Sequence, residues 1–363
     1  MNEQLALRTL SDLLGWTYQA HSEFAWLRLM SKFKYDAYQG YEPGMRFFES
    51  LISWLHQFDT KPDREVAYEF LKTRLIFFSK NEVAHLVHRF YPIVRDTLSK
   101  AIAKEHQIQP YEIWTHPSTK GLYEVSLRKS MFVGLSDGAM MDVFRRSNEG
   151  KLSNEQIVVA HEISEPKWKG MVEKLEEDIK AKHWNTQAMF QHVFLIDDFT
   201  ASGTSLITPK LGGGWSGKIN KFITSNEKYL SRFLENPCLL HVHHYLATSD
   251  AKVTVEAYAA QLEAQHPEFN IDLTFGHIIE GQFKITPQED PKFYALLTNH
   301  YDPGVETTIS GTVQFGYKNC SLPVVLEHNT PNNTVGLIWA ESNGAVALPA
   351  KTLKPLFRRR TRH

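Results

Sequence analysis

The sequence predicts an α/β protein: a mostly parallel sheet with flanking helices, preceded by an all-α N-terminal region. Up to about residue 105 the apolar residues recur every three or four positions, as in amphipathic helices. After about residue 125 short apolar runs alternate with helix-like segments, which indicates parallel strands covered by helices on both faces. With 363 residues, of which 42% are hydrophobic and 22% charged, the chain can bury a large core.

Four or five helices are predicted in the N-terminal region. Thr60 precedes Pro62, and a capping hydroxyl followed by proline is typical of a helix start. Because the apolar residues have helical spacing, we assign them to the core and not to a ligand. These residues form three apolar stripes, each on one face of a predicted helix: Leu7/Leu10/Leu14, Phe47/Leu51/Trp54 and Leu71/Leu75/Phe78.

The parallel sheet is expected to be built from runs at residues 131–135, 157–160, 193–196, 239–246 and 271–279. The crossover helices are expected at residues 139–146, 168–182, 219–234 and 255–265.

Three segments are predicted along the chain: a helical domain (1–120), the α/β core (121–284) and a mixed C-terminal extension (285–363). In the extension we expect a helix near 292–299, strands near 324–326 and 335–339, and a basic tail. That tail, 351–363, carries Lys351, Lys354, Arg358, Arg359, Arg360 and Arg362.

Charge and cysteine content narrow the function classes. The net charge of −1 gives no global field toward nucleic acid or an anionic membrane, so any phosphate site must be local. Two cysteines, Cys238 and Cys320, are too few for a disulfide scaffold and lack zinc-site spacing. The start lacks a signal peptide and no run is long enough to span a bilayer. We therefore expect a cytoplasmic protein without membrane contact, whose oligomeric state is open.

The segment richest in chemistry is an apolar strand that ends in Asp197 and Asp198, followed by a small, hydroxyl-rich turn. Open parallel sheets bind ligands just beyond the carboxyl ends of their strands. Two adjacent carboxylates suit the vicinal hydroxyls of a ribose and can orient Mg²⁺, directly or through water. Small residues allow backbone N–H groups to converge on a phosphate. The phosphate-binding candidates are Thr200, Ala201, Ser202, Gly203, Thr204 and Ser205.

This segment resembles the signature of the type I phosphoribosyltransferase family: four apolar residues, two acidic residues and a small turn that ends in Gly and Thr or Ser. The resemblance implies that Asp197 and Asp198 contact the ribose hydroxyls of 5-phosphoribosyl 1-pyrophosphate (PRPP), and that residues 201–205 bind its 5-phosphate. It also implies Mg²⁺ as cofactor and a pyrophosphate-binding loop after an earlier strand. Ser136, Asp137 and Gly138 are the candidates, although a carboxylate at Asp137 repels pyrophosphate unless Mg²⁺ lies between them.

Other motifs leave alternatives open. The glycine-rich insertion 209–218 is expected to form a mobile loop over the site. Its glycines and its final lysine resemble a nucleotide-binding P-loop, but Ile219 stands where that motif requires Ser or Thr. His241, His243 and His244 are assigned to core or surface, not to a metal. A turn between two predicted strands can contact a base or ribose through His328, Asn329 and Asn332, or be only a turn.

The helical N-terminal region, residues 311–326 and this turn are also similar to phosphoribosyltransferase-like proteins of bacterial conflict and anti-phage systems, including some retrons. The leading hypothesis is an enzyme that binds PRPP or a nucleotide and acts at the ribose anomeric carbon, as the effector of such a system. The alternative is a catalytically inactive module that senses PRPP or a nucleotide, or binds a partner. A defence-system protein, RNA or DNA is a candidate partner of the N-terminal helices or the basic tail.

Overall fold

A computed structural model describes residues 2–17, 21–40, 46–308, 313–342 and 352–360. The chain divides into two compact units. One, the sheet unit, is Val83–Ile279, every residue of which is described. The other, the terminal unit, joins Met1–Glu82 to Glu280–His363. The three segments expected from the sequence stay a prediction.

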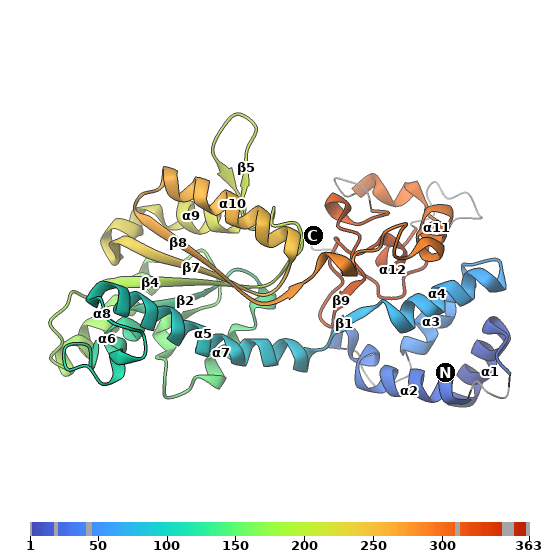
Figure 1. Ribbon diagram of the computed structural model, residues 1–363, viewed down its shortest axis with the longest axis horizontal. Coiled ribbons are helices and arrows are strands. Elements are labelled where there is room, and N and C mark those ends of the chain that lie inside the picture. The colour runs from blue at the N-terminus through green and yellow to red at the C-terminus, as the bar shows by residue number, and fades with distance from the viewer. Residues whose placement is uncertain (1, 18–20, 41–45, 309–312, 343–351, 361–363) are drawn as a thin grey trace. The chain divides into compact units, whose positions relative to one another are not determined.

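The sheet unit contains a five-stranded parallel sheet (Figure 1). Its strand order is β3-β2-β4-β7-β8, so the predicted parallel architecture is confirmed. The strands are β2 (Ser130–Gly134), β3 (Ile157–Val158), β4 (Phe190–Thr200), β7 (Leu234–Thr248) and β8 (Phe269–Ile279). The helices are α5 (Lys80–His106), α6 (Leu122–Arg128), α7 (Met141–Ser147), α8 (Glu165–Ala181), α9 (Lys218–Phe233) and α10 (Ser249–Gln265), with short 3-10 turns η3 (Glu112–Trp114), η4 (Asp137–Ala139) and η5 (Asn154–Gln156).

Helices cover both faces of this sheet because successive strand residues point to opposite sides. Val193 and Leu195 of β4 share one core with Trp168 of α8, Phe222 of α9 and residues of α10. On the other face, Phe194 meets the ring of Phe90 from α5 at 6.0 Å between centroids. Figure 1 shows α9 and α10 on one side of the sheet and α5 on the other.

The terminal unit joins the two ends of the chain. Its elements are α1 (Glu3–Leu14), α2 (His21–Phe33), η2 (Tyr35–Gly40), α3 (Arg46–His56), α4 (Lys61–Thr73), β1 (Ile76–Phe78), η6 (Gly281–Phe283), α11 (Pro291–Asn299), η7 (Pro303–Thr308), η8 (Tyr317–Asn319), β9 (Val324–Leu326) and α12 (Gly336–Trp339). Thr60 caps α4 as predicted, with its side chain accepting from the N–H of Asp63. Trp54 Nε1 donates to the Leu337 carbonyl at 2.8 Å, which ties α3 to α12.

Two predictions in the terminal unit are wrong. The run 335–339 forms a short helix, α12 with Val335 as its N-cap, and not a strand. Its four apolar side chains and one glycine are all buried, so they show no period that distinguishes a helix from a strand. The stripe that ends at Phe78 does not stay helical, because α4 ends at Thr73 and β1 pairs in parallel with β9. Pairing with a strand that follows far along the chain overrides the local spacing.

The glycine-rich insertion after the hydroxyl-rich turn forms a hairpin of β5 (Thr208–Pro209) and β6 (Trp215–Ser216). Positive φ angles of 93°, 103° and 79° at Gly212, Gly213 and Gly214 turn its tip. The hairpin leads directly into α9 at Lys218. Among the described residues, no helix combines the length and apolar character that crossing a bilayer requires.

Candidate functional site

Asp197 and Asp198 lie near the carboxyl end of β4, where the sequence placed them. As consecutive strand residues, their side chains point to opposite faces of the sheet. Asp197 shares a face with Leu195 and pairs with Lys218 of α9, whereas Asp198 lies against Gly138 of the loop after β2. The two carboxylates therefore have different surroundings, and each has to be considered separately.

Asp197 is 1% exposed, and both of its carboxylate oxygens interact with the protein. Ser136 Oγ, from the loop after β2, donates to Oδ1 at 2.5 Å. The Lys218 ammonium, from the first residue of α9, forms an ion pair with Oδ2. A buried carboxylate is stable only when it is paired and hydrogen-bonded, and these two donors meet that requirement.

His244 completes the surroundings of Asp197. In the sheet register it is the β7 partner of Asp197, and its Nε2 lies 3.7 Å from Asp197 Oδ2. Burial by itself raises the pKa of Asp197, but the His244 ring and the Lys218 ammonium outweigh it. The net result is a pKa below the ordinary value of 3.8, so Asp197 is ionised at neutral pH.

Asp198 is half-buried and contacts the candidate pyrophosphate loop. A Cβ added to Gly138 would lie 2.2 Å from Asp198 Oδ2, so this contact requires glycine. The next residue, Ala139, accepts a hydrogen bond from the Tyr245 hydroxyl at 3.0 Å. Burial, followed by the charges of Asp198 and Asp197, raises the pKa of Tyr245, which keeps this hydroxyl protonated as a donor. Asp137 is exposed.

The turn after β4 carries polar groups that suit an anion. Within the described residues, the backbone N–H groups of 202–205 donate to no protein acceptor. Thr200 Oγ1 is buried and also lacks a hydrogen-bond partner there. Ser202 Oγ and Thr204 Oγ1 lie 2.9 Å apart. Converging amides and hydroxyls of this kind are the usual ligands of a phosphate group.

Packing fixes the position of this turn. Thr248 Oγ1, at the N-cap of α10, donates to the Ala201 carbonyl at 2.6 Å. Gly203 has φ +75°, and a Cβ there would lie 2.8 Å from Val255 of α10. The backbone N–H of Lys218 donates to the Ser205 carbonyl at 3.1 Å. The turn is therefore held between the first turns of α9 and α10.

Mg²⁺ at Asp197, which the sequence predicted, fits this geometry poorly. Mg²⁺ needs carboxylate oxygens that are free to complete an octahedral shell. Ser136 donates to one Asp197 oxygen and the Lys218 ammonium pairs with the other, so a metal ion bound directly to Asp197 would compete with both donors. In the described residues, no group of three or more His, Cys, Asp or Glu side chains is arranged to hold a metal ion. Asp197 therefore does not fit as a direct magnesium ligand.

Comparison with known families connects this geometry to the resemblance seen in the sequence. A family model described as PRTase-CE matches residues 51–359. The chain belongs to the PRTase-CE family. It is therefore phosphoribosyltransferase-like, and the match includes the whole sheet unit and most of the terminal unit. Searches of curated proteins and of solved structures find no match.

In this PRTase-CE protein the remaining site candidates lie in the terminal unit. Asn329 Oδ1 accepts from the N–H of Arg360 at 2.9 Å, and Asn329 Nδ2 donates to the carbonyl of the same residue. The Asn332 carbonyl accepts from Tyr317 N–H at 2.7 Å, and His328 is exposed. The turn thus holds the C-terminal segment, and a role for His328, Asn329 and Asn332 in base contact stays a prediction.

The described part of the basic tail is packed against the terminal unit of the PRTase-CE chain. Leu356 and Phe357 are buried in its core, and Arg358 pairs with Glu341 at 2.7 Å. Lys351 and residues 361–363, which include Arg362, lie outside the described residues, as does Gly311.

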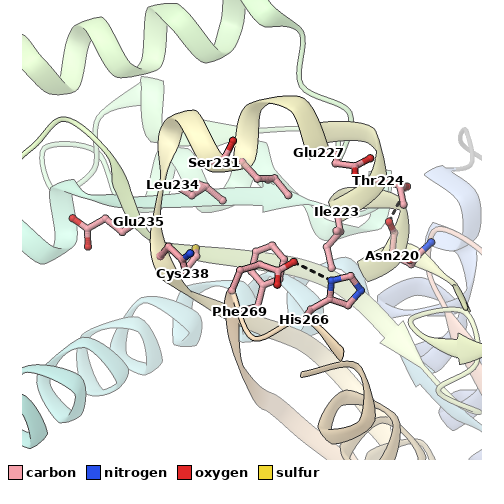
Figure 2. A pocket seen from close by; sticks show the side chains of 13 residues that line it. Asn220, Ile223, Thr224, Glu227, Ser231, Leu234, Glu235, Cys238, His266 and Phe269 are labelled. Carbon is pink, nitrogen blue, oxygen red and sulfur yellow. Dashed lines mark hydrogen bonds and ion pairs between the residues drawn. The ribbon is translucent and has the colours of Figure 1, made fainter. Parts of the chain in front are cut away.

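A separate pocket of about 290 Å³ lies at the amino-terminal end of β7 (Figure 2). It is lined by Ile223 and Glu227 of α9, and by Cys238 and Phe269 of the sheet. Burial raises the pKa of the Cys238 thiol to about 12, so this thiol is a poor nucleophile at neutral pH. None of the residues predicted for the site lines this pocket.

Sequence reasoning missed three residues that lie around the acidic pair and the Gly138 loop of this PRTase-CE protein. Lys218 was considered only as part of an imitation P-loop, although it pairs with Asp197. His244 was assigned to core or surface; it is buried, and its place beside Asp197 follows from the strand register. Tyr245 carried no motif. It could have been found from its position one residue after His244, which places its side chain on the opposite face of the sheet. There its hydroxyl donates to the Ala139 carbonyl, next to Gly138.

Proposed function

We propose that this PRTase-CE protein binds a 5-phosphorylated ribose compound, PRPP or a nucleotide, and acts at its anomeric carbon. One observation carries the proposal: the candidate pyrophosphate loop and the acidic pair form one site. Ser136 bonds to Asp197, and Gly138 lies against Asp198. The two segments are far apart in sequence, and a ligand with a ribose and a pyrophosphate needs both of them side by side.

The turn after β4 supports binding of the 5-phosphate. Its amides at 202–205 and the Thr200 hydroxyl have no acceptor or partner among the described residues, so they can donate to phosphate oxygens without breaking protein hydrogen bonds. Binding energy from this unreactive phosphate can orient the anomeric carbon for reaction. Loss of the anchor should therefore reduce turnover as well as affinity.

The roles of the two carboxylates differ in this proposal. Asp198 faces the loop and is half-buried, so we assign it to the ribose hydroxyls. Asp197 is a positioning residue that holds Ser136 and Lys218 in place. In the reaction, a base nitrogen forms a bond to the anomeric carbon while the bond to pyrophosphate breaks, and the leaving oxygen keeps the electron pair. The Asp198 charge stabilises the positive charge that develops on the ribose ring.

Mg²⁺ is proposed to bind the pyrophosphate of PRPP and not Asp197. When bound there it neutralises the pyrophosphate oxygens, which also reduces their repulsion from the exposed Asp137. The residues of the chain then need only orient the ribose and its 5-phosphate.

Two assays on the full-length protein test the proposal. Calorimetry with PRPP and Mg²⁺ measures binding, and a pyrophosphate-release assay over a panel of bases measures transfer. We expect binding and base-dependent release. Absence of binding by both PRPP and nucleotides would overturn the proposal.

A second candidate is a module that binds PRPP or a nucleotide without catalysis. It is favoured by the position of Asp137, which places an exposed carboxylate in the loop assigned to the leaving pyrophosphate. Binding without release for every base would support this candidate. The substitution Asp137→Gly distinguishes the enzyme from the binding module. If the variant releases pyrophosphate and the unmodified protein does not, the rest of the catalytic site is intact and Asp137 alone prevents the reaction.

We also propose a role in anti-phage defence, with a protein, RNA or DNA partner. It is supported by the similarity of the N-terminal helices and the 328–333 turn to proteins of such systems. Plaque counts on cells that carry the gene with its neighbours test it. Protection that Asp198→Asn abolishes is expected, and protection that never exceeds the empty-vector control would contradict it.

A further inference from the structure

The Lys218 ammonium lies next to Asp197, at one of the two carboxylate oxygens to which a metal ion could bind. Its ammonium contacts Asp197 Oδ2, and Ser136 Oγ contacts the other oxygen. The Asp197 side chain is 2% exposed, whereas the Lys218 side chain is 25% exposed. One carboxylate charge is thus balanced by one ammonium charge, and the ammonium remains in reach of a ligand at the surface.

The backbone around Lys218 fixes this position. Lys218 is the first residue of α9, and its N–H donates to the Ser205 carbonyl of the phosphate turn at 3.1 Å. Gly217 before it has φ +103°, and a Cβ there would lie 2.4 Å from the Leu206 carbonyl oxygen. Only glycine allows this approach. The same turn that we assign to the 5-phosphate therefore also holds the lysine.

A divalent ion at Asp197 Oδ2 would compete with this ammonium. Two cations beside one buried carboxylate repel each other strongly where water is excluded, so the bound ammonium disfavours a second cation there. An ammonium group is a point charge that binds phosphate as well as carboxylate, so the lysine can serve the turn and Asp197 together.

We propose that Lys218 supplies the positive charge beside Asp197 that Mg²⁺ would otherwise supply, so that the ribose 5-phosphate part of the ligand binds without metal. This inference rests on the proposed function. Mg²⁺ is then required only for the binding of ligands that carry pyrophosphate.

Ribose 5-phosphate is the probe, because it has the 5-phosphate and the ribose but no pyrophosphate. Calorimetry on the full-length protein compares its affinity in excess EDTA and in MgCl₂. We expect equal affinity in the two conditions. The variant Lys218→Met should lose about tenfold or more in affinity in EDTA, since it removes a charge-assisted hydrogen bond. Lys218→Arg should keep most of the affinity.

Lys221→Met is the matched control: it removes an exposed lysine one turn further along α9 and should bind as the natural protein does. Thermal unfolding of each variant verifies folding, and the EDTA comparison on the unmodified protein needs no variant at all. Binding only in MgCl₂, or undiminished binding by a folded Lys218→Met variant, would overturn the role of Lys218. Absence of ribose 5-phosphate, PRPP and nucleotide binding in both conditions would instead overturn the proposed function, and this inference with it.

Discussion

Ser136 Oγ donates a hydrogen bond to Asp197 Oδ1 at 2.5 Å and so joins the loop after β2 to the end of β4. The two strands are neighbours in the sheet, with Gly134 paired to Ile196. Because β2 and β4 are parallel, the segments that follow them leave the sheet at the same edge. This relationship makes one site from two motifs, and the first three predictions depend on it.

Asp198→Asn should leave the fold intact and lower kcat/KM by about 100-fold or more, because the amide lacks the charge that stabilises the developing positive charge. The measurement is steady-state turnover with PRPP or a nucleotide, and Tm shows that the variant is folded. Asp142→Asn is the control, since this exposed residue on α7 pairs with Arg146 at the surface. Unchanged turnover in the Asp198 variant would remove Asp198 from the mechanism.

Gly138→Ala should displace Asp198, because the added Cβ would lie 2.2 Å from its Oδ2. We expect a loss of about 1–3 kcal/mol in unfolding free energy, as for other overpacked sites. Weaker binding of ribose 5-phosphate should accompany that loss. Urea unfolding and calorimetry measure the two effects.

Gly170→Ala is the control for that experiment. A Cβ at Gly170, inside α8, meets nothing within 4 Å. The substitution should raise the unfolding free energy by about 0.5–1 kcal/mol, because alanine favours the helix. Binding should not change. An equal loss of binding in both variants would show that the effect is not local to Asp198.

Thr200→Val should have opposite effects on stability and on binding. Valine keeps the shape of threonine and removes a buried hydroxyl that lacks a partner in the described residues, so stability should stay equal or rise. If Thr200 donates to the 5-phosphate, affinity should fall about tenfold, as expected for one hydrogen bond to a charged group. Thr224→Val, on the exposed side of α9, should leave affinity unchanged. Undiminished affinity in the Thr200 variant would exclude this donor.

His243→Leu should weaken the dependence of stability on pH. Burial, with a smaller effect of His244, lowers the pKa of His243 from 6.5 to about 3. Below pH 6.5 the unfolded chain binds a proton that the folded protein does not, so the unfolding free energy falls as pH falls toward 3. Between pH 6.5 and pH 5 this amounts to about 2 kcal/mol.

Urea unfolding at pH 7 and pH 5 measures this contribution. The drop between the two pH values should be smaller by about 2 kcal/mol in His243→Leu than in the unmodified protein. His277→Gln, which changes an exposed histidine on β8, should keep the full drop. Equal drops in the His243 variant and the unmodified protein would contradict the burial of a neutral His243.

Much of the sheet unit could be predicted, because its strands and helices carry their own periods. The run 193–196 lies inside β4, and the segment 168–182 nearly coincides with α8. The acidic pair and the small turn could also be recognised from the local sequence. Carboxylates and hydroxyls follow the apolar run 193–196, and a buried strand does not need these residue types. By contrast, β1 could not be predicted, since a strand of three residues has no period and its partner, β9, comes much later in the chain.

The amino-acid sequence by itself determined the α/β class, the place of Asp197 and Asp198 at the end of a strand, and the composition of the turn that follows them. Only the tertiary structure decided that the two carboxylates face different neighbours, and that Lys218 and His244 belong to Asp197. The physical reason is that periodicity reports which face of an element is buried. The partners of a buried charge depend on strand register and on where the next helix begins, and both are settled only when distant segments pack together.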